Sequence, residues 1–392
     1  MQSLTEDEDK EPEISINKNG KLLFEKLDSQ FDYSGRLKGS DFTDYRCGFI
    51  SIIGAPNMGK STLLNALLQE DLCITTARPQ TTRHAILGLL TTESCQVCLV
   101  DTPGVIATPS YKLQEGMMEA VVGAFRDADV LMVVTDLFST PIPDDELFAK
   151  VQRSGKPTIV VINKIDLASV VNVTAPENQD KSVTVEQAVA IWRQLLPDAL
   201  AILPCSASKG PNDPGVVALR RLLVGGPGVP ESLRELGRPV PGMYAKPNVR
   251  FLTDEEAKAL LPQSPPLYDQ EALTDRTERF IASEIIRSSL FECLNKELPY
   301  CCEVQIEEFK EPRDVGNSKP VTRIAASVIV ERDSQKLIVI GKKGEKIKEV
   351  GTKARAKIEK FLDTSVYLNL NVKVSKDWRK DEDKLKLYGY IN

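Results

Sequence analysis

The sequence predicts an α/β fold built on a mostly parallel sheet, followed by a second region that mixes helices and strands. Five short apolar runs alternate with helix-compatible segments, at 49–53, 97–100, 131–135, 158–162 and 201–203. This alternation is typical of a parallel sheet with helices on both faces. After residue 275 the pattern changes to a helix, two strands of alternating polarity, a basic helix and a last strand.

Composition excludes several classes of protein. The chain has 392 residues, of which 42% are hydrophobic and 27% charged, as in globular domains. This length allows two or three domains. No apolar run approaches the roughly 18 residues that indicate a membrane span, so an integral membrane protein is not expected.

The formal net charge of −6 is unevenly distributed. Residues 1–45 carry 6 basic and 11 acidic side chains, whereas residues 321–392 carry 17 basic and 10 acidic ones. A basic end in an otherwise acidic protein indicates an anionic partner, and nucleic acid is the first candidate.

Glycine and proline divide the chain. Both are dense between residues 225 and 272, and such density breaks regular elements. We expect an acidic, disordered extension at 1–45, a first domain at 46–224, a linker or insertion at 225–272 and a second domain at 273–392. A smaller surface insertion is expected at 168–185.

The eight cysteines do not form the framework of a small disulfide-rich protein, because the chain is too long. Cys95 and Cys98 form a CxxC pair that could indicate zinc or redox chemistry. The chain has only one histidine and no second CxxC pair, so buried structural thiols in a reducing compartment are the better interpretation.

A phosphate-binding motif follows the first apolar run. Residues 54–61 match GxxxxGK[ST] between a strand and a helix, which is the context this loop requires. Its backbone N–H groups and the helix N-terminus attract phosphate, Lys60 can reach the outer phosphates and the Ser61 hydroxyl can bind Mg²⁺. The predicted phosphate-binding residues are Gly54, Ala55, Pro56, Asn57, Met58, Gly59, Lys60, Ser61 and Thr62.

Two further segments complete a predicted metal and switch site. Asp101 begins a DTPG motif at a strand end, where its carboxylate can hold Mg²⁺ through water and Gly104 can donate to a γ-phosphate. The motif QTTRH at 80–84 lies between the phosphate-binding loop and DTPG. We favour Thr82 over Thr81 as the hydroxyl that binds Mg²⁺. The predicted switch residues are Gln80, Thr81, Thr82, Arg83, His84, Asp101, Thr102, Pro103, Gly104 and Val105, and the predicted Mg²⁺ ligands are Ser61, Thr82 and Asp101.

Two of these residues bear on hydrolysis. His84 could serve as a general base, although a polar residue flanking a helix is the simpler interpretation. Ras-type enzymes position water with a glutamine just after their DxxG motif. Here that position is Val105, so we expect slow intrinsic hydrolysis, with water placed by backbone, a cation or another loop.

The base of the nucleotide that binds at these motifs is predicted to be guanine. Asn163-Lys-Ile-Asp166 follows the fourth apolar run, and a carboxylate can accept from both N1–H and N2–H of guanine but faces an acceptor in adenine. Ser206-Ala207 follows the fifth apolar run and can offer backbone N–H groups to guanine O6. This pair, the phosphate-binding loop, DTPG and NKID all follow strand ends, where open α/β sheets bind ligands. The predicted guanine-binding residues are Asn163, Lys164, Asp166, Ser206 and Ala207.

The basic end carries a GxxG loop between an apolar run and a helix. Between residues 341 and 361 there are eight basic and three acidic residues. Glycines allow close approach of a sugar–phosphate backbone, lysines supply charge and an adjacent apolar groove can take unstacked bases. A solvated helix face is the alternative. The predicted RNA-binding residues are Gly341, Lys342, Lys343, Gly344, Lys346 and Lys348.

Taken together, these motifs resemble the Era family of GTPases, which belongs to the TrmE-Era-EngA class. The resemblance runs from about Cys47 to Tyr390 outside the insertions. It is carried by GAPNMGKSTLLNALL, QTTRH, DTPG, NKID, CSAS, LTDRTERFIASEIIR, ELPY, VERDSQK, VIGKKGEKIKEVG, VKVSKDWR and LYGY.

The resemblance implies a Ras-like P-loop GTPase domain followed by an α+β type II KH domain. It also implies that GTP favours the RNA-binding form, that the RNA is the 3′ end of small-subunit ribosomal RNA, and that the partner is the pre-small ribosomal subunit. Mg²⁺ is the implied cofactor, and K⁺ held by Asn57 is a further candidate. The chain is expected to be monomeric, with peripheral membrane contact known for some relatives.

Other interpretations remain. The chain could be a KH scaffold that binds nucleotide with little turnover, or a signalling or membrane GTPase without RNA. The acidic extension and the insertion near 224–262 favour an organelle stroma or matrix, in a chloroplast or mitochondrion, with a bacterial-type cytoplasm as the alternative. The long tether also leaves open whether nucleotide and RNA binding are coupled.

Overall fold

The computed structural model describes residues 44–76, 78–138, 145–167, 184–224, 260–311 and 320–391. Most of the expected extension at 1–45, most of the expected insertion at 168–185 and the first part of the expected linker, 225–259, lie outside these residues. In the part of the chain that is described, no helix combines the length and the apolar character needed to cross a membrane.

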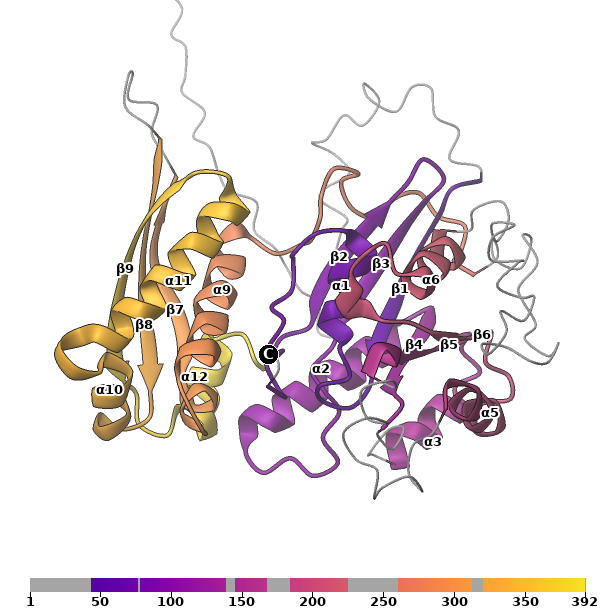
Figure 1. Ribbon diagram of the computed structural model, residues 1–392, viewed down its shortest axis with the longest axis horizontal. Coiled ribbons are helices and arrows are strands. Elements are labelled where there is room, and N and C mark those ends of the chain that lie inside the picture. The colour runs from indigo at the N-terminus through magenta and orange to yellow at the C-terminus, as the bar shows by residue number, and fades with distance from the viewer. Residues whose placement is uncertain are drawn as a thin grey trace, which may run out of the picture. The chain divides into compact units, whose positions relative to one another are not determined.

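Six strands form the first sheet, in the order β2-β3-β1-β4-β5-β6 (Figure 1). Their bounds are β1 (Arg46–Ile53), β2 (Ile86–Thr91), β3 (Cys95–Asp101), β4 (Val130–Asp136), β5 (Thr158–Asn163) and β6 (Ala201–Pro204). β2 runs antiparallel to β3 and all other neighbouring pairs are parallel. The predicted mostly parallel sheet is therefore confirmed. β2 was not predicted, because a short turn rather than a helix joins it to β3.

Helices cover both faces of this sheet (Figure 1). α1 (Lys60–Leu68) and α6 (Pro214–Val224) share one apolar core with one face, and α2 (Lys112–Asp127), α3 (Asp145–Arg153) and α5 (Val185–Leu195) share a second core with the other. The covered faces leave the carboxyl ends of the parallel strands as the edge available to a ligand. Two short 3₁₀ helices lie at this edge, η4 (Ile165–Leu167) and η6 (Ala207–Lys209).

Part of the expected linker packs against the first sheet. The Cys47 amide donates to Pro262 O (3.1 Å), and the Gln96 side chain accepts from the amides of Leu267 and Tyr268 (2.9 Å each). Leu260 and Leu261 join the apolar core that contains α1. Residues 260–268 therefore contribute to the folded structure around β1 and β3.

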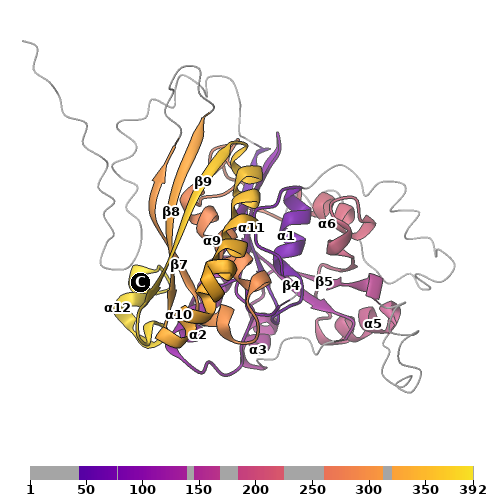
Figure 2. The same ribbon diagram turned by 60° about the vertical axis from the view of Figure 1, so that its left-hand side comes forward.

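A second sheet has the order β7-β8-β9 (Figure 2). It is formed by β7 (Glu303–Lys310), β8 (Val321–Val330) and β9 (Ser365–Val374), with β7 and β8 antiparallel and β8 and β9 parallel. The helices α9 (Glu278–Cys293), α10 (Asp333–Ile340) and α11 (Glu345–Leu362) pack on one face of it. The predicted apolar face of α9, with Ile286 and Leu290, is fully buried.

The end of the chain packs around a buried tryptophan. Three short elements lie here or nearby: η7 (Leu298–Cys301), η9 (Trp378–Lys380) and α12 (Glu382–Leu387). Trp378 is fully buried and its indole N–H donates to Cys301 O (3.1 Å). Trp378 and Tyr390 share an apolar cluster with Leu113 and Met117 of α2. The last described residues therefore contact the first domain as well as the second.

All eight cysteines are free and buried. Cys95 and Cys98 lie on β3, an interior strand next to the edge strand β2. Burial raises the pKa of the Cys95 thiol, so it is protonated near neutral pH. These positions agree with the interpretation as structural thiols.

Candidate nucleotide site and nucleic-acid interface

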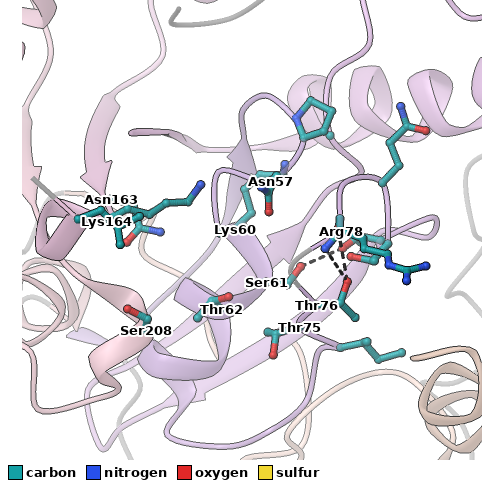
Figure 3. A pocket seen from close by; sticks show the side chains of 18 of the residues that line it. Asn57, Lys60, Ser61, Thr62, Thr75, Thr76, Arg78, Asn163, Lys164 and Ser208 are labelled. Carbon is teal, nitrogen blue, oxygen red and sulfur yellow. Dashed lines mark hydrogen bonds between the residues drawn. The ribbon is translucent and has the colours of Figure 1, made fainter. Parts of the chain in front are cut away.

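A pocket of about 290 Å³ lies at the carboxyl edge of the first sheet. Figure 3 shows Lys60 and Ser61 between Asn163, Lys164 and Ser208 on one side and Thr76 and Arg78 on the other. The pocket is lined by Pro56, Asn57, Gly59, Lys60, Ser61, Thr62, Ile74, Thr75, Thr76, Arg78, Gln80, Thr81, Thr82, Gly104, Asn163, Lys164, Asp166, Leu167 and Ser208. Most of the predicted phosphate, switch and guanine motifs thus meet in one cavity.

The loop between β1 and α1 curls around the start of the helix. Gly59 has φ +85°, and a Cβ at this position would lie 2.4 Å from Asn163 Nδ2, so only glycine fits. The buried Lys60 ammonium donates to Gly54 O (3.1 Å) and Ala55 O (3.0 Å). Burial lowers the pKa of Lys60 to about 8. The loop therefore presents a cation beside the N-terminus of α1.

Three oxygen donors from different motifs meet next to Lys60. Ser61 Oγ donates to Asp101 Oδ2 (2.6 Å) and lies 2.9 Å from Thr82 Oγ1. Burial raises the pKa of Asp101 to about 6, while the nearby Lys60 acts in the opposite direction. The other carboxylate oxygen of Asp101 is buried and has no hydrogen-bond partner.

This donor set fits Mg²⁺. Hydroxyl and carboxylate oxygens are the ligands that a hard divalent cation prefers, with phosphate oxygens and water completing its shell. A buried carboxylate oxygen without a partner is costly, and a nearby cation would satisfy it. The residues involved are those predicted for the metal.

The remaining residues of the DTPG segment brace this arrangement. Thr102 Oγ1 donates to Ile52 O (2.7 Å), and the amide of Val105 donates to Gly54 O (3.0 Å). Pro103 and Val105 are buried, and Gly104 lines the pocket. The segment that follows β3 is thereby tied to the phosphate-binding loop.

The NKID motif is connected to two other loops. The Asn163 side chain donates to Met58 O (2.9 Å) and accepts from the Ala207 amide (3.0 Å). Asp166 accepts a hydrogen bond from the Ser206 hydroxyl, and the Ser206 amide donates to Asp213 Oδ1 (3.1 Å). The backbone N–H groups of Ser206 and Ala207, which were expected to face guanine O6, therefore donate to Asp213 and Asn163 within the protein.

The chain supplies lining residues that have no motif of their own. Thr76, Arg78, Leu167 and Ser208 line the pocket, and Asp136 at the end of β4 binds the Lys164 ammonium (3.0 Å). Proximity to the motifs was the only available signal for Leu167 and Ser208, and Thr76 and Arg78 had none. The pocket thus includes residues that the motifs do not indicate.

Four predicted switch residues line the pocket, and six do not: Arg83, His84, Asp101, Thr102, Pro103 and Val105. Two of these six, Arg83 and His84, contact the second domain. Arg83 is 3% exposed and forms an ion pair with Glu303 of β7 (3.1 Å). The His84 ring stacks on Tyr390 (centroids 4.3 Å apart) and meets Phe280 edge-on. Burial lowers the pKa of His84. The geometry gives no support to His84 as a general base, since its ring is packed against the second domain.

The GxxG loop joins α10 to α11. Gly341 has φ +74°, and a Cβ there would lie 2.6 Å from the Lys346 Cβ. The short helix η8 (Lys342–Gly344) exposes both of its lysines.

Charge and apolar surface meet beside this loop. Lys346 pairs with Glu349, whereas no carboxylate of the described residues pairs with Lys342, Lys343 or Lys348. On α10, Leu337 and Ile338 are 71% and 61% exposed. The loop thus combines unpaired cations with open apolar side chains, as an RNA surface requires.

Family models match parts of both domains. A family model described as 50S ribosome-binding GTPase matches residues 49–164, and a KH domain model matches residues 297–379. The GTPase Era of Geobacter metallireducens is 37% identical over 347 residues, covering 88% of this chain and 98% of that protein. The GTPase Era of Xylella fastidiosa strain Temecula1 is 35% identical over 346 residues, with the same coverage.

Two solved structures are similar over most of the chain. A single-residue variant of Aquifex aeolicus Era bound to GDP·AlF₄⁻ has a TM-score of 0.68 and 30% sequence identity, covering 88% of this chain and all of that one. Era in complex with MgGDPNP and nucleotides 1506–1542 of 16S ribosomal RNA has a TM-score of 0.67 and 30% identity, covering 89% and 100%. With its P-loop domain of Ras-like fold followed by a KH domain, the chain belongs to the Era family of GTPases.

Proposed function

We propose that this chain binds Mg²⁺ and GTP in the pocket beside Lys60, hydrolyses GTP to GDP and phosphate, and binds the 3′ end of small-subunit ribosomal RNA through its KH domain during assembly of the small ribosomal subunit. The observation that carries the proposal is the meeting of Ser61, Thr82 and Asp101 oxygens beside a buried lysine. The same chain carries a GxxG loop with two exposed lysines, Lys342 and Lys343, which form no ion pair with the residues that the structure describes.

The phosphate groups are assigned to the 54–62 loop. Its N–H groups and the N-terminus of α1 would bind the phosphates, and Lys60 would exchange its bonds to Gly54 O and Ala55 O for the outer phosphate oxygens. This exchange offsets the cost of keeping the ammonium group buried.

The metal is assigned to Ser61, Thr82 and Asp101. When bound, Mg²⁺ would neutralise charge on the β- and γ-phosphate oxygens. The Ser61 and Thr82 hydroxyls would bind it directly, and Asp101 would orient its water. The relative solved with MgGDPNP supports this assignment.

Guanine is assigned to Asp166, with Lys164 covering the face of the base. The Ser206 hydroxyl donates to the Asp166 carboxylate, and Asp136 holds the Lys164 ammonium (3.0 Å). Each group is thus oriented before the base arrives, which lowers the entropic cost of binding. Asn163 would fix the phosphate-binding loop relative to the 206–207 segment through its hydrogen bonds to Met58 O and the Ala207 amide.

Hydrolysis is proposed to be slow without a partner. Val105 cannot donate or accept through its side chain, and it is 1% exposed. A K⁺ ion would compensate by adding positive charge near the transferred phosphate. Asn57 is the proposed ligand, because it is exposed, lines the pocket and holds a left-handed conformation with φ +64°.

RNA binding is assigned to residues 341–348 and the apolar side chains of α10. A relative 30% identical to this chain was solved with nucleotides 1506–1542 of 16S ribosomal RNA. Exposed lysines would bind the sugar–phosphate backbone, while Leu337 and Ile338 would contact unstacked bases.

A single-turnover assay tests the enzymatic part. Wild type should convert GTP to GDP, faster in K⁺ than in Na⁺ and faster again with an oligonucleotide of the rRNA 3′ end. Chelation of Mg²⁺ should stop the reaction, and Lys60→Ala should abolish nucleotide binding. Arg153→Ala, which removes an exposed cation on α3, is the control. Bound but unconverted GTP under all conditions would favour the scaffold function instead.

The compartment and the assembly state are further proposals. We propose a monomer in an organelle stroma or matrix, a compartment suggested by the proline- and glycine-rich stretch near 224–262. Fluorescent fusions and light scattering test these two points. Flotation with vesicles tests for peripheral membrane contact.

A further inference from the structure

The loop that carries Thr82 is held from both sides by the KH domain. On one side, Arg287 of α9 donates through Nη1 to Thr81 O. On the other side, Arg83 donates to Cys302 O (2.8 Å), Tyr300 O (2.9 Å) and Glu303 Oε2 (3.1 Å). The proposed metal ligand is therefore flanked by two contacts to residues that lie more than 200 positions later in the chain.

Arg287 is itself fixed before it reaches the loop. Its Nε donates to Glu284 Oε1 (2.8 Å), and its Nη2 forms an ion pair with Glu284 Oε2. Arg287 is 1% exposed and Glu284 is 4% exposed. A guanidinium that is held bidentately by a carboxylate has one defined direction left for its remaining donors.

That direction determines where the Thr82 hydroxyl lies. Thr81 O and Thr82 N belong to one planar peptide unit, so fixing the carbonyl fixes the orientation of the Thr82 backbone. The Thr82 hydroxyl lies 2.9 Å from Ser61 Oγ at the proposed Mg²⁺ site. A shift of about 1 Å in a positioned group can cost a hundredfold in rate.

We propose that Arg287 is a positioning residue for GTP hydrolysis, through which the KH domain holds Thr82 at the metal. The inference rests on the proposed function of the pocket. This role makes the second domain part of the GTPase site. Without Arg287, the 80–84 loop loses the hydrogen bond to Thr81 O that orients Thr82 toward the metal. GDP lacks the γ-phosphate, and binding of GDP does not require this ligand.

Two variants test this role. Arg287→Lys keeps a cation opposite Glu284 but loses the bidentate hydrogen bonding. Glu284→Gln with Arg287→Gln removes both charges together. Neither variant leaves an unpaired buried charge. Both should lower kcat for GTP by roughly tenfold to a hundredfold and raise the Mg²⁺ concentration needed for half-maximal rate. Affinity for fluorescent GDP should stay within about twofold.

The matched control is Glu292→Gln with Lys357→Gln. These residues form an exposed ion pair between α9 and α11, and their removal should leave kcat and the Mg²⁺ dependence unchanged. Thermal unfolding with GDP bound checks that each variant is folded. If the double variant is not folded, the kinetics of Arg287→Lys alone test the inference.

A double-mutant cycle separates positioning from general stability. In a Thr82→Ala background, Arg287→Lys should cause no further change in the Mg²⁺ dependence. Additive losses, equal losses for GDP and a GTP analogue, or wild-type kinetics in both Arg287 variants would each overturn the inference. Wild type that shows no Mg²⁺-dependent hydrolysis would instead refute the proposed function.

Discussion

The Arg83 guanidinium lies 3.1 Å from Glu303 Oε2, in a buried ion pair between residues 220 positions apart. Arg83 follows the proposed metal ligand directly, and Glu303 begins the first strand of the KH sheet. Its carboxylate also accepts from the Tyr390 hydroxyl. The nucleotide loop, the KH sheet and the end of the described chain thus meet at one carboxylate.

Breaking this ion pair should be strongly destabilising. Arg83→Met leaves a buried carboxylate and several carbonyls without their donor, a change that costs about 3–5 kcal/mol. Arg83→Met with Glu303→Gln should recover part of that loss. Chemical denaturation of both variants provides the measurement. Lys112→Met, in the exposed pair with Glu382, should leave the midpoint nearly unchanged. A similar loss there would show that burial of the Arg83–Glu303 pair is not the cause of the destabilisation.

His84 should make the protein less stable in mild acid. Burial against Tyr390 and Phe280 lowers its pKa, an effect that Glu284 and Glu303 oppose and that Arg287 and Arg276 reinforce. Below pH 6.5 the histidine is protonated in the unfolded chain but stays neutral in the folded chain. The free energy of unfolding therefore decreases as the pH is lowered. The slope should approach about 1.4 kcal/mol per pH unit.

His84→Phe keeps the ring stack and removes the titration. Unfolding midpoints of wild type and variant should be compared between about pH 5 and 7.5, the range over which an ordinary histidine titrates. The stability that wild type loses relative to the variant should grow as the pH is lowered. The acid response of Asp101, whose pKa is raised to about 6, has the opposite sign but is common to both proteins. Parallel curves would show that His84 does not contribute.

Base selection should depend on Asp166. Asp166→Asn replaces two charge-assisted hydrogen bonds to guanine, so GTP affinity should fall at least ~100-fold, while xanthosine triphosphate should bind better than GTP. Competition with a fluorescent nucleotide measures both. Asp198→Asn changes an exposed carboxylate and serves as the control. GTP affinity equal to that of wild type in the Asp166 variant would refute the guanine assignment.

RNA affinity should depend on the GxxG lysines. Lys342→Asp with Lys343→Asp should weaken binding of an rRNA 3′-end oligonucleotide by about 100-fold or more and make the salt dependence less steep by about two units. GTP binding should persist. The same change in charge at Arg153 and Arg221, two exposed residues of the first domain, should have little effect. RNA binding retained by the loop variant would exclude the assigned surface.

The sequence predicted best what depends on local patterns. The strands at 97–100 and 158–162, the helix after Lys60 and the buried face of α9 follow from apolar periodicity, which local sequence carries directly. The antiparallel β2 was missed because no helix separates it from β3. The GxxxxGK[ST] and NKID motifs converge on one pocket because both follow the carboxyl ends of parallel strands.

Contacts between distant segments could not be predicted. Arg83 and His84 belong to a switch motif by sequence, yet they contact Glu303 and Tyr390. The bond from Arg287 to Thr81 O joins positions 206 apart. Nothing in the local sequence around Arg287 distinguishes a buried arginine that reaches another domain from an exposed arginine on a helix.

The resemblance to the Era family implies that GTP favours the RNA-binding form, and one RNA titration in two nucleotide states tests this expectation together with both proposed binding sites. Wild type loaded with a non-hydrolysable GTP analogue or with GDP is titrated with RNA corresponding to nucleotides 1506–1542 of 16S ribosomal RNA. Binding should be about tenfold tighter in the GTP state, a coupling within the usual allosteric range. Equal affinity in the two states, or no binding in either, would contradict it.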